Sequence, residues 1–190
     1  AVDKTVIIGD QAGGSDMTSA ADGTIAIGFK AAEALTTGAG NTVLGYQALD
    51  AADDVDSCVV IGNSAMGQVG SAEPDGCVAI GHSALQGTST TSGNGTVAIG
   101  FNALTSLTTG AYNLAVGNRS QQGQTDGDSN VSIGYGSLQA ADSGESHNIA
   151  IGHNALTDLN NGAADKNIAI GSGAMSGLNT IAGTQNIGIG

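Results

Sequence analysis

The chain has 190 residues, of which 32 are glycine and one is proline, and aromatic residues make up only 3%. Globular proteins of this length ordinarily use more large side chains, so the composition predicts a thin core of Val, Ile, Leu and Ala. The formal net charge is −13, with only four basic residues, which argues against binding to nucleic acids or to anionic membranes.

A short phrase that ends in glycine recurs from one end of the chain to the other, at intervals of 17 to 19 residues. Its glycine stands at positions 9, 28, 45, 62, 81, 100, 117, 134, 152, 171 and 190. Self-similarity at a short, nearly fixed period is typical of a solenoid, in which each repeat packs only against its neighbours. We therefore expect one repeat domain over residues 1–190. Because the chain starts and stops in mid-repeat, we expect it to be a piece of a longer protein.

The three residues before each glycine predict a short β-strand. In chain order these segments are 6–8, 25–27, 42–44, 59–61, 78–80, 97–99, 114–116, 131–133, 149–151, 168–170 and 187–189. Their first and third residues are large and aliphatic, except Thr42, whereas the middle residue is usually small. Residues two apart share a strand face, so each strand has a large aliphatic face and a small-residue face. A thin roll covers one face only, and we expect the flat Ala-rich face to stay exposed for subunit contacts.

The residues after each glycine predict a corner and then a second short strand. Ala or Ser stands three places after the glycine in nearly every repeat, and Leu or Met usually follows it. Gly13, Ala32 and Gln121 break the Leu column, so we expect looser packing there. Glycine suits a corner because it tolerates positive φ and close backbone approach. Val in place of Gly45 or Gly100 is therefore expected to disrupt the fold more than Gly127→Ser, since Gly127 lies in a polar loop of variable length.

Stacked parallel strands fit this period better than helices do, because two helices do not fit in 17 to 19 residues. The calcium-binding nonapeptide roll needs repeated G-G-x-G-x-D, and the chain has one Gly-Gly, at 13–14. A hexapeptide coil needs an aliphatic residue five places after the glycine, where polar or small residues stand instead. An ice-binding ladder of Thr pairs recurs in only two repeats, at 36–37 and 108–109. The sequence thus predicts an all-β parallel roll of about 11 coils, with two short strands per coil.

Two stretches resemble known repeats. The segments 148–152 and 167–171, both Asn-Ile-Ala-Ile-Gly, resemble the head repeat of trimeric autotransporter adhesins. The longer segment 37–49, TGAGNTVLGYQAL, is similar to a variant of that repeat found in phage tail fibres. The resemblance implies a left-handed parallel β-roll, a homotrimer, and a location on a virion or outside the cell. The repeat unit is longer than that of the adhesins, and Thr or Cys replaces the expected Asn in five repeats.

The leading hypothesis is a structural segment of a virion fibre, such as a phage tail fibre. In this hypothesis the chain is a stiff trimeric spacer that contributes to attachment to a host. Its partners would be other copies of the chain, other fibre or tail proteins, and a glycan or protein of the host surface. The alternative is the stalk or head of a bacterial trimeric surface adhesin, and a hexapeptide-type acyltransferase is the alternative outside these classes. The leading hypothesis expects no enzyme activity, no catalytic residue, no cofactor and no membrane insertion.

Aromatic residues gather in the position directly after the corner glycine. Phe29, Tyr46, Phe101 and Tyr135 occupy it, and so do His82 and His153. This column is a candidate stripe for stacking against sugar rings, or else a corner that packs between subunits, and both interpretations remain open. The two histidines lie four repeats apart, roughly 19 Å along the axis, and so do not share a metal ion.

Asp126, Asp128 and Asn130 resemble the start of a calcium loop, which makes them the one candidate metal site of the sequence. The later glycine and glutamate of that loop are wrongly placed. Cys58 and Cys77 both stand four residues before a corner glycine, in a column that otherwise holds Thr or Asn. They are expected to stack in neighbouring coils with Cα atoms about 5 Å apart and without a disulfide, since in-register parallel neighbours point the same way.

Overall fold

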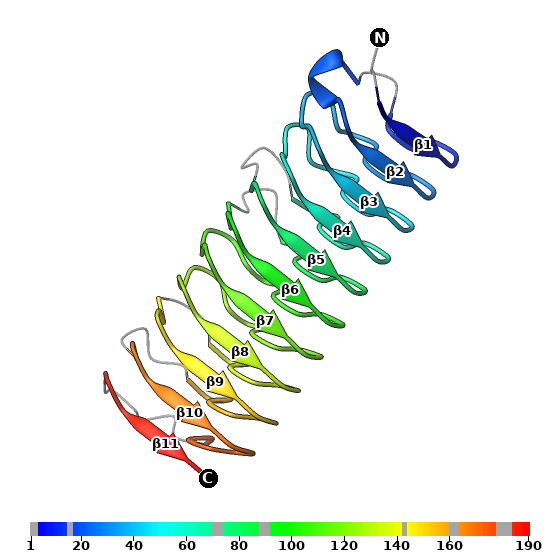
Figure 1. Ribbon diagram of the computed structural model, residues 1–190. Coiled ribbons are helices and arrows are strands. Elements are labelled where there is room, and N and C mark those ends of the chain that lie inside the picture. Colours follow the sequence, from blue (N-terminus) through cyan, green and yellow to red (C-terminus); the bar gives the residue numbers. More distant parts are fainter. Residues whose placement is uncertain are drawn as a thin grey trace.

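The computed structural model describes residues 4–14, 17–69, 74–87, 92–141, 144–159, 164–177 and 184–190. Its strands form a single parallel sheet in chain order, and the coils follow one another along a rod with the termini at opposite ends (Figure 1). The strands are β1 (Val6–Ile8), β2 (Ile25–Ile27), β3 (Thr42–Leu44), β4 (Val59–Ile61), β5 (Val78–Ile80), β6 (Val97–Ile99), β7 (Leu114–Val116), β8 (Val131–Ile133), β9 (Ile149–Ile151), β10 (Ile168–Ile170) and β11 (Ile187–Ile189). One short 3-10 helix, η1 (Ser19–Ala21), precedes β2.

The register of the sheet follows the glycine-based repeat. Val78 of β5 pairs with Val97 of β6, and Val97 pairs in turn with Leu114 of β7. Every other neighbouring pair of strands keeps the same column-to-column register, whether the interval is 17, 18 or 19 residues. The predicted parallel β-solenoid is thereby confirmed, and the loops absorb the variation in repeat length.

The prediction that the Ala-rich strand face is exposed is wrong. The middle residue of each of the strands β2 to β10 is fully buried, for example Ala98, whereas Leu44 is 44% exposed and Ile133 is 38% exposed. The reason is that the opposite wall of the coil supplies the bulk of the core through the Leu/Met column, and little room remains beside it. A Cβ added at Gly188 of β11 would lie 2.5 Å from Cγ of Met175. The strands therefore contribute small side chains inward and their large aliphatic side chains point outward.

The segment after the corner is a turn and not the second strand that the sequence predicts. Gln47 and Leu49 both have positive φ, at 51° each, and the equivalent positions of the other coils do the same. Left-handed backbone costs an L-residue roughly 1–2 kcal/mol. Hydrogen bonds to both neighbouring coils offset this cost, because the Gln47 N–H donates to the Phe29 carbonyl at 2.9 Å and the Leu49 N–H donates to the Ala65 carbonyl at 3.0 Å. Stacking thus stabilises a conformation that a single coil would not hold.

Buried amide side chains form a polar ladder at the start of the strands. Oδ1 of Asn148 accepts the backbone N–H of Asn167 at 2.9 Å, and Asn130 does the same for Asn148. All three side chains are fully buried. A second ladder, two residues earlier, points toward the preceding coil, as where Oδ1 of Asp75 accepts the N–H of Asp56 at 2.8 Å. Because buried polar groups need partners, these ladders fix the stacking register.

The apolar core is interrupted between β7 and β9. One cluster of buried apolar residues runs from Ala26 to Ala115 and another from Leu138 to Ala174. Between them lie buried polar side chains: Ser120, Gln121, Gln124, Ser132 and Ser137. Nε2 of Gln121 donates to the Leu114 carbonyl at 3.0 Å, while its Oε1 has no partner among the described residues. Gln121 thus replaces apolar packing by hydrogen bonds. For this reason we expect the coil that contains Gln121, where the Leu column is broken, to be less stable than its neighbours.

Candidate interaction surfaces

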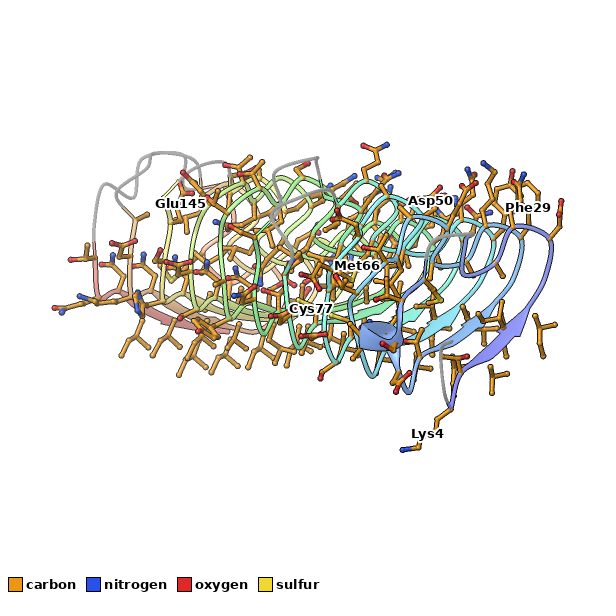
Figure 2. All side chains as sticks on the ribbon, turned by 90° about the horizontal axis from the view of Figure 1, so that it is seen from above. Lys4, Phe29, Asp50, Met66, Cys77 and Glu145 are labelled. Carbon is orange, nitrogen blue, oxygen red and sulfur yellow. The ribbon has the colours of Figure 1, made fainter. Side chains whose placement is uncertain are left out.

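One side of the rod is a continuous aliphatic surface. We define the aliphatic face as the first and third residues of strands β1 to β11. Figure 2 shows side chains pointing away from the interior along the whole sheet. Those with more than a third of their surface exposed are Val6, Ile8, Ile25, Leu44, Ile133, Ile170, Ile187 and Ile189. No charged residue belongs to this face, and Thr42 is its one polar member. An apolar surface that extends over every coil makes this face a candidate interaction site.

The other candidate surface is a row of aromatic rings, which we call the aromatic row: Phe29, Tyr46, His82, Phe101, Tyr135 and His153. The rings form three stacked pairs, Phe29–Tyr46, His82–Phe101 and Tyr135–His153, with centroids 5.2, 5.2 and 5.3 Å apart. Tyr46, Phe101 and Tyr135 are 44–50% exposed. The sequence predicted the shared column, and the structure shows that each histidine there stacks on an aromatic ring of a neighbouring coil.

The aromatic row and the aliphatic face lie on different sides of the coil. In Figure 2 the labelled Phe29 and Asp50 lie across the rod from the strands. The backbone changes direction at the corner glycine. The side chain of the next residue therefore points away from the side of the sheet that carries the aliphatic face. Subunits that associate through the aliphatic face would therefore leave the aromatic row accessible.

A small group of charged residues lies beside the first ring pair. Nζ of Lys30 lies 3.0 Å from the Glu33 carboxylate and 5.8 Å from the centroid of the Phe29 ring. The hydrogen bond to Glu33 raises the pKa of Lys30, and burial raises the pKa of Asp50. Lys30 therefore stays cationic at neutral pH and is the charged neighbour of the first ring pair.

The three residues of the candidate calcium loop point in different directions. Oδ1 of Asp126 accepts the N–H of Gly144 in the following coil at 2.6 Å, whereas Oδ1 of Asp128 accepts the N–H of Ala111 in the preceding coil at 2.7 Å. Asn130 is buried in the amide ladder. The described part of the chain holds no cluster of three or more His, Cys, Asp or Glu side chains suited to a metal ion. Calcium binding at these residues thus has no converging ligand set to support it.

Cys58 and Cys77 stack as the sequence predicts. Both thiols are buried and unbonded, and the Cys77 N–H donates to Sγ of Cys58 at 3.3 Å. Each thiol also donates to a carbonyl, Cys58 to Pro74 at 3.3 Å and Cys77 to Gly93 at 3.2 Å. The cysteines thus continue the ladder that asparagines form elsewhere. The hydrogen bond with Cys58, followed by burial, raises the pKa of the Cys77 thiol well above its usual range.

We expect both thiols to be inert in the folded protein. Both thiols are buried away from reagents. The raised pKa also keeps the Cys77 thiol protonated at neutral pH, whereas the hydrogen bond with Cys77 lowers the pKa of Cys58, so burial alone protects Cys58. Titration with a chromogenic disulfide reagent should detect no thiol per chain in buffer and two per chain in denaturant. Prompt reaction of either cysteine in buffer would contradict the buried ladder.

The sequence pattern missed two features of these surfaces. The outward direction of the large strand residues was missed because both strand faces are apolar, so hydrophobicity does not say which one is buried. The polar members of the column after the glycine, Asn63 and Asn118, do not stand out by residue type. Their regular placement between ring pairs was the available signal.

Within the described ranges, no helix is both long and apolar enough to cross a membrane. Comparisons with protein-family models, with curated proteins and with solved structures found no match to this chain.

Proposed function

We propose that the chain is a segment of a trimeric virion fibre, such as a phage tail fibre, and that it serves as a stiff spacer in attachment to a host surface. The observation that carries the proposal is the aliphatic face, which extends without a charged residue over all eleven strands. A surface of this kind is unfavourable in water and favours a partner of equal length. Further copies of the same rod, aligned side by side, provide such a partner.

Stiffness follows from the hydrogen bonding between coils. At the strand, at the turn and at both polar ladders, backbone N–H groups of one coil bind oxygen atoms of its neighbour. Bending the rod would break several of these bonds at once. With only four Lys and Arg residues in the chain, trypsin has few sites to attack. Both properties suit a spacer that works outside the cell.

A bacterial trimeric surface adhesin is the second candidate, and the asparagine ladder favours it. Asn148 and Asn167 begin the two repeats that resemble the adhesin head, and both are buried in that ladder. The acyltransferase alternative gains no support from the fold. Within the described ranges each coil contributes one strand to one sheet. A coil built of three hexads would instead contribute one strand for each hexad.

Immunogold electron microscopy separates the two candidates. Antibodies raised against the purified rod should label fibres on virions produced by the organism that carries the gene. Label spread over the surface of cells that produce no virions would favour the adhesin instead. The absence of label from both would contradict both proposals.

A further inference from the structure

The aromatic row is interrupted twice, each time by one coil. Between Asp10 and Ser172, which also follow corner glycines, the column reads Phe29, Tyr46, Asn63, His82, Phe101, Asn118, Tyr135 and His153. Two stacked rings are followed by one asparagine, and this order occurs twice before the third pair. Neighbouring pairs are thus separated by one coil that carries an amide in place of a ring.

We call the gap between neighbouring ring pairs an interval. Each interval has the dimensions of one ring. The coils are parallel and in register, so Tyr46 and His82 are two coil spacings apart, about 10 Å. A ring in contact with both faces at about 3.5–4.0 Å on each side occupies roughly 7–8 Å, and a puckered ring occupies more. The interval between Phe101 and Tyr135 has the same size by the same register.

The rings present their outer faces to these intervals. In each pair the two rings are stacked and within 20° of parallel, and they belong to successive coils. One face of Tyr46 is covered by Phe29, and its other face is turned along the row toward Asn63. Phe101 is related to Asn118 in the same way. Tyr46, Tyr135 and Phe101 are 44–50% exposed, so each interval has ring surface that a ligand can reach.

The asparagines supply hydrogen bonds between the rings. Asn63 and Asn118 are exposed. Oδ1 of Asn63 accepts from Oγ of Ser64 at 2.9 Å, and its Nδ2 has no acceptor among the residues that the structure describes. The Asn118 side chain makes no hydrogen bond to those residues. Each interval thus combines two ring faces with an amide whose Nδ2 has no acceptor among the described residues.

We propose that each interval binds one pyranose ring of a carbohydrate chain, sandwiched between two aromatic faces and hydrogen-bonded through its hydroxyls to the asparagine. The C–H groups of a sugar suit the electron-rich ring faces, and the amide suits its hydroxyls. A nucleobase would also stack, but the net charge of −13 repels nucleic acid. The row lies across the coil from the aliphatic face (Figure 2), which leaves it accessible in an assembly built on that face.

The inference deepens the proposed role in attachment, but the geometry itself requires only the folded rod. Saturation-transfer NMR on the full chain with the uncharged chains maltohexaose, chitohexaose and cellohexaose tests it. At least one probe should bind with its ring protons saturated, and isothermal titration should give its affinity. Binding of none of the three would overturn the inference.

Two double variants locate the site. Tyr46→Ala with Tyr135→Ala removes one wall of each interval, and Asn63→Phe with Asn118→Phe fills each interval with a ring that this column accepts elsewhere. Both should weaken binding at least 10-fold, whereas Tyr112→Ala, an exposed tyrosine outside the row, should not. Unchanged binding in either double variant would overturn the inference.

The mass of each variant in solution, compared with that of the unaltered protein, keeps the two proposals apart. Lost binding at unchanged mass supports the sugar site. A change of mass on loss of the tyrosines would mean that another copy covers the row, which overturns the site and leaves the fibre proposal standing. Sugar binding by a chain that stays monomeric would overturn the fibre proposal alone.

Discussion

Gly100→Val is expected to destabilise the rod severely, by roughly 3–5 kcal/mol for each altered corner. Gly100 has φ of +139°, a conformation that residues with a side chain rarely adopt. A Cβ there would lie 2.6 Å from the carbonyl carbon of Gly117 and 3.2 Å from the backbone nitrogen of Asn118. These are backbone atoms of the next coil, so neither side can move without breaking the sheet. Thermal unfolding followed by circular dichroism should show a large loss of melting temperature.

Gly76→Ala is the matched control for this substitution. Gly76 also has positive φ, at +66°, but an added Cβ would meet no described atom within 4 Å. Its cost should be about 1 kcal/mol, since only the left-handed backbone is penalised. The sequence-based choice of Gly127 as a tolerant position is wrong, because a Cβ there would meet Nε2 of Gln124 and the carbonyl oxygen of Glu145. Equal melting temperatures for the Gly100 and Gly76 variants would contradict the tight corner.

Leu44→Asp with Ile133→Asp is expected to abolish association of the rods. Both side chains belong to the aliphatic face, in β3 and β8, and both are more than a third exposed in the single chain. Burial of an unpaired carboxylate in an apolar interface costs several kcal/mol, and symmetry repeats this cost in every copy. Sedimentation velocity should show single chains, and circular dichroism should show that the coils remain folded.

Gln47→Glu with Asn102→Asp is the control for charge. It adds the same two negative charges in the turns next to the aromatic row, away from the aliphatic face. We expect these changes to leave the assembly intact. Dissociation by both double variants would mean that charge repulsion, rather than contact through the aliphatic face, decides the state of association.

The columns of the repeat were predictable because one glycine per coil fixes the register. Every strand pair, the Cys58–Cys77 contact and the shared column of Phe29 and Tyr46 follow from counting residues from that glycine. Each of these features depends only on which residues lie in neighbouring coils. Sequence spacing specifies that property directly.

The directions of side chains were not predictable in the same way. Leu49 and Leu104 adopt left-handed backbone although leucine rarely does so, because hydrogen bonds from neighbouring coils determine their conformation. Ala98 is buried and Ile99 points outward because the opposite wall already fills the core with Leu and Met. Both outcomes depend on packing across the coil, which a repeat pattern in one dimension does not contain.

The mass of the native protein in solution tests the trimeric rod most directly. Light scattering coupled to size-exclusion chromatography, at tens of micromolar chain, should give three times the chain mass of 18.3 kDa. A trimer that the Leu44→Asp, Ile133→Asp variant converts to single chains is the result that we predict. A native protein that stays at 18.3 kDa at this concentration, with the aliphatic face exposed to water, would contradict the proposal.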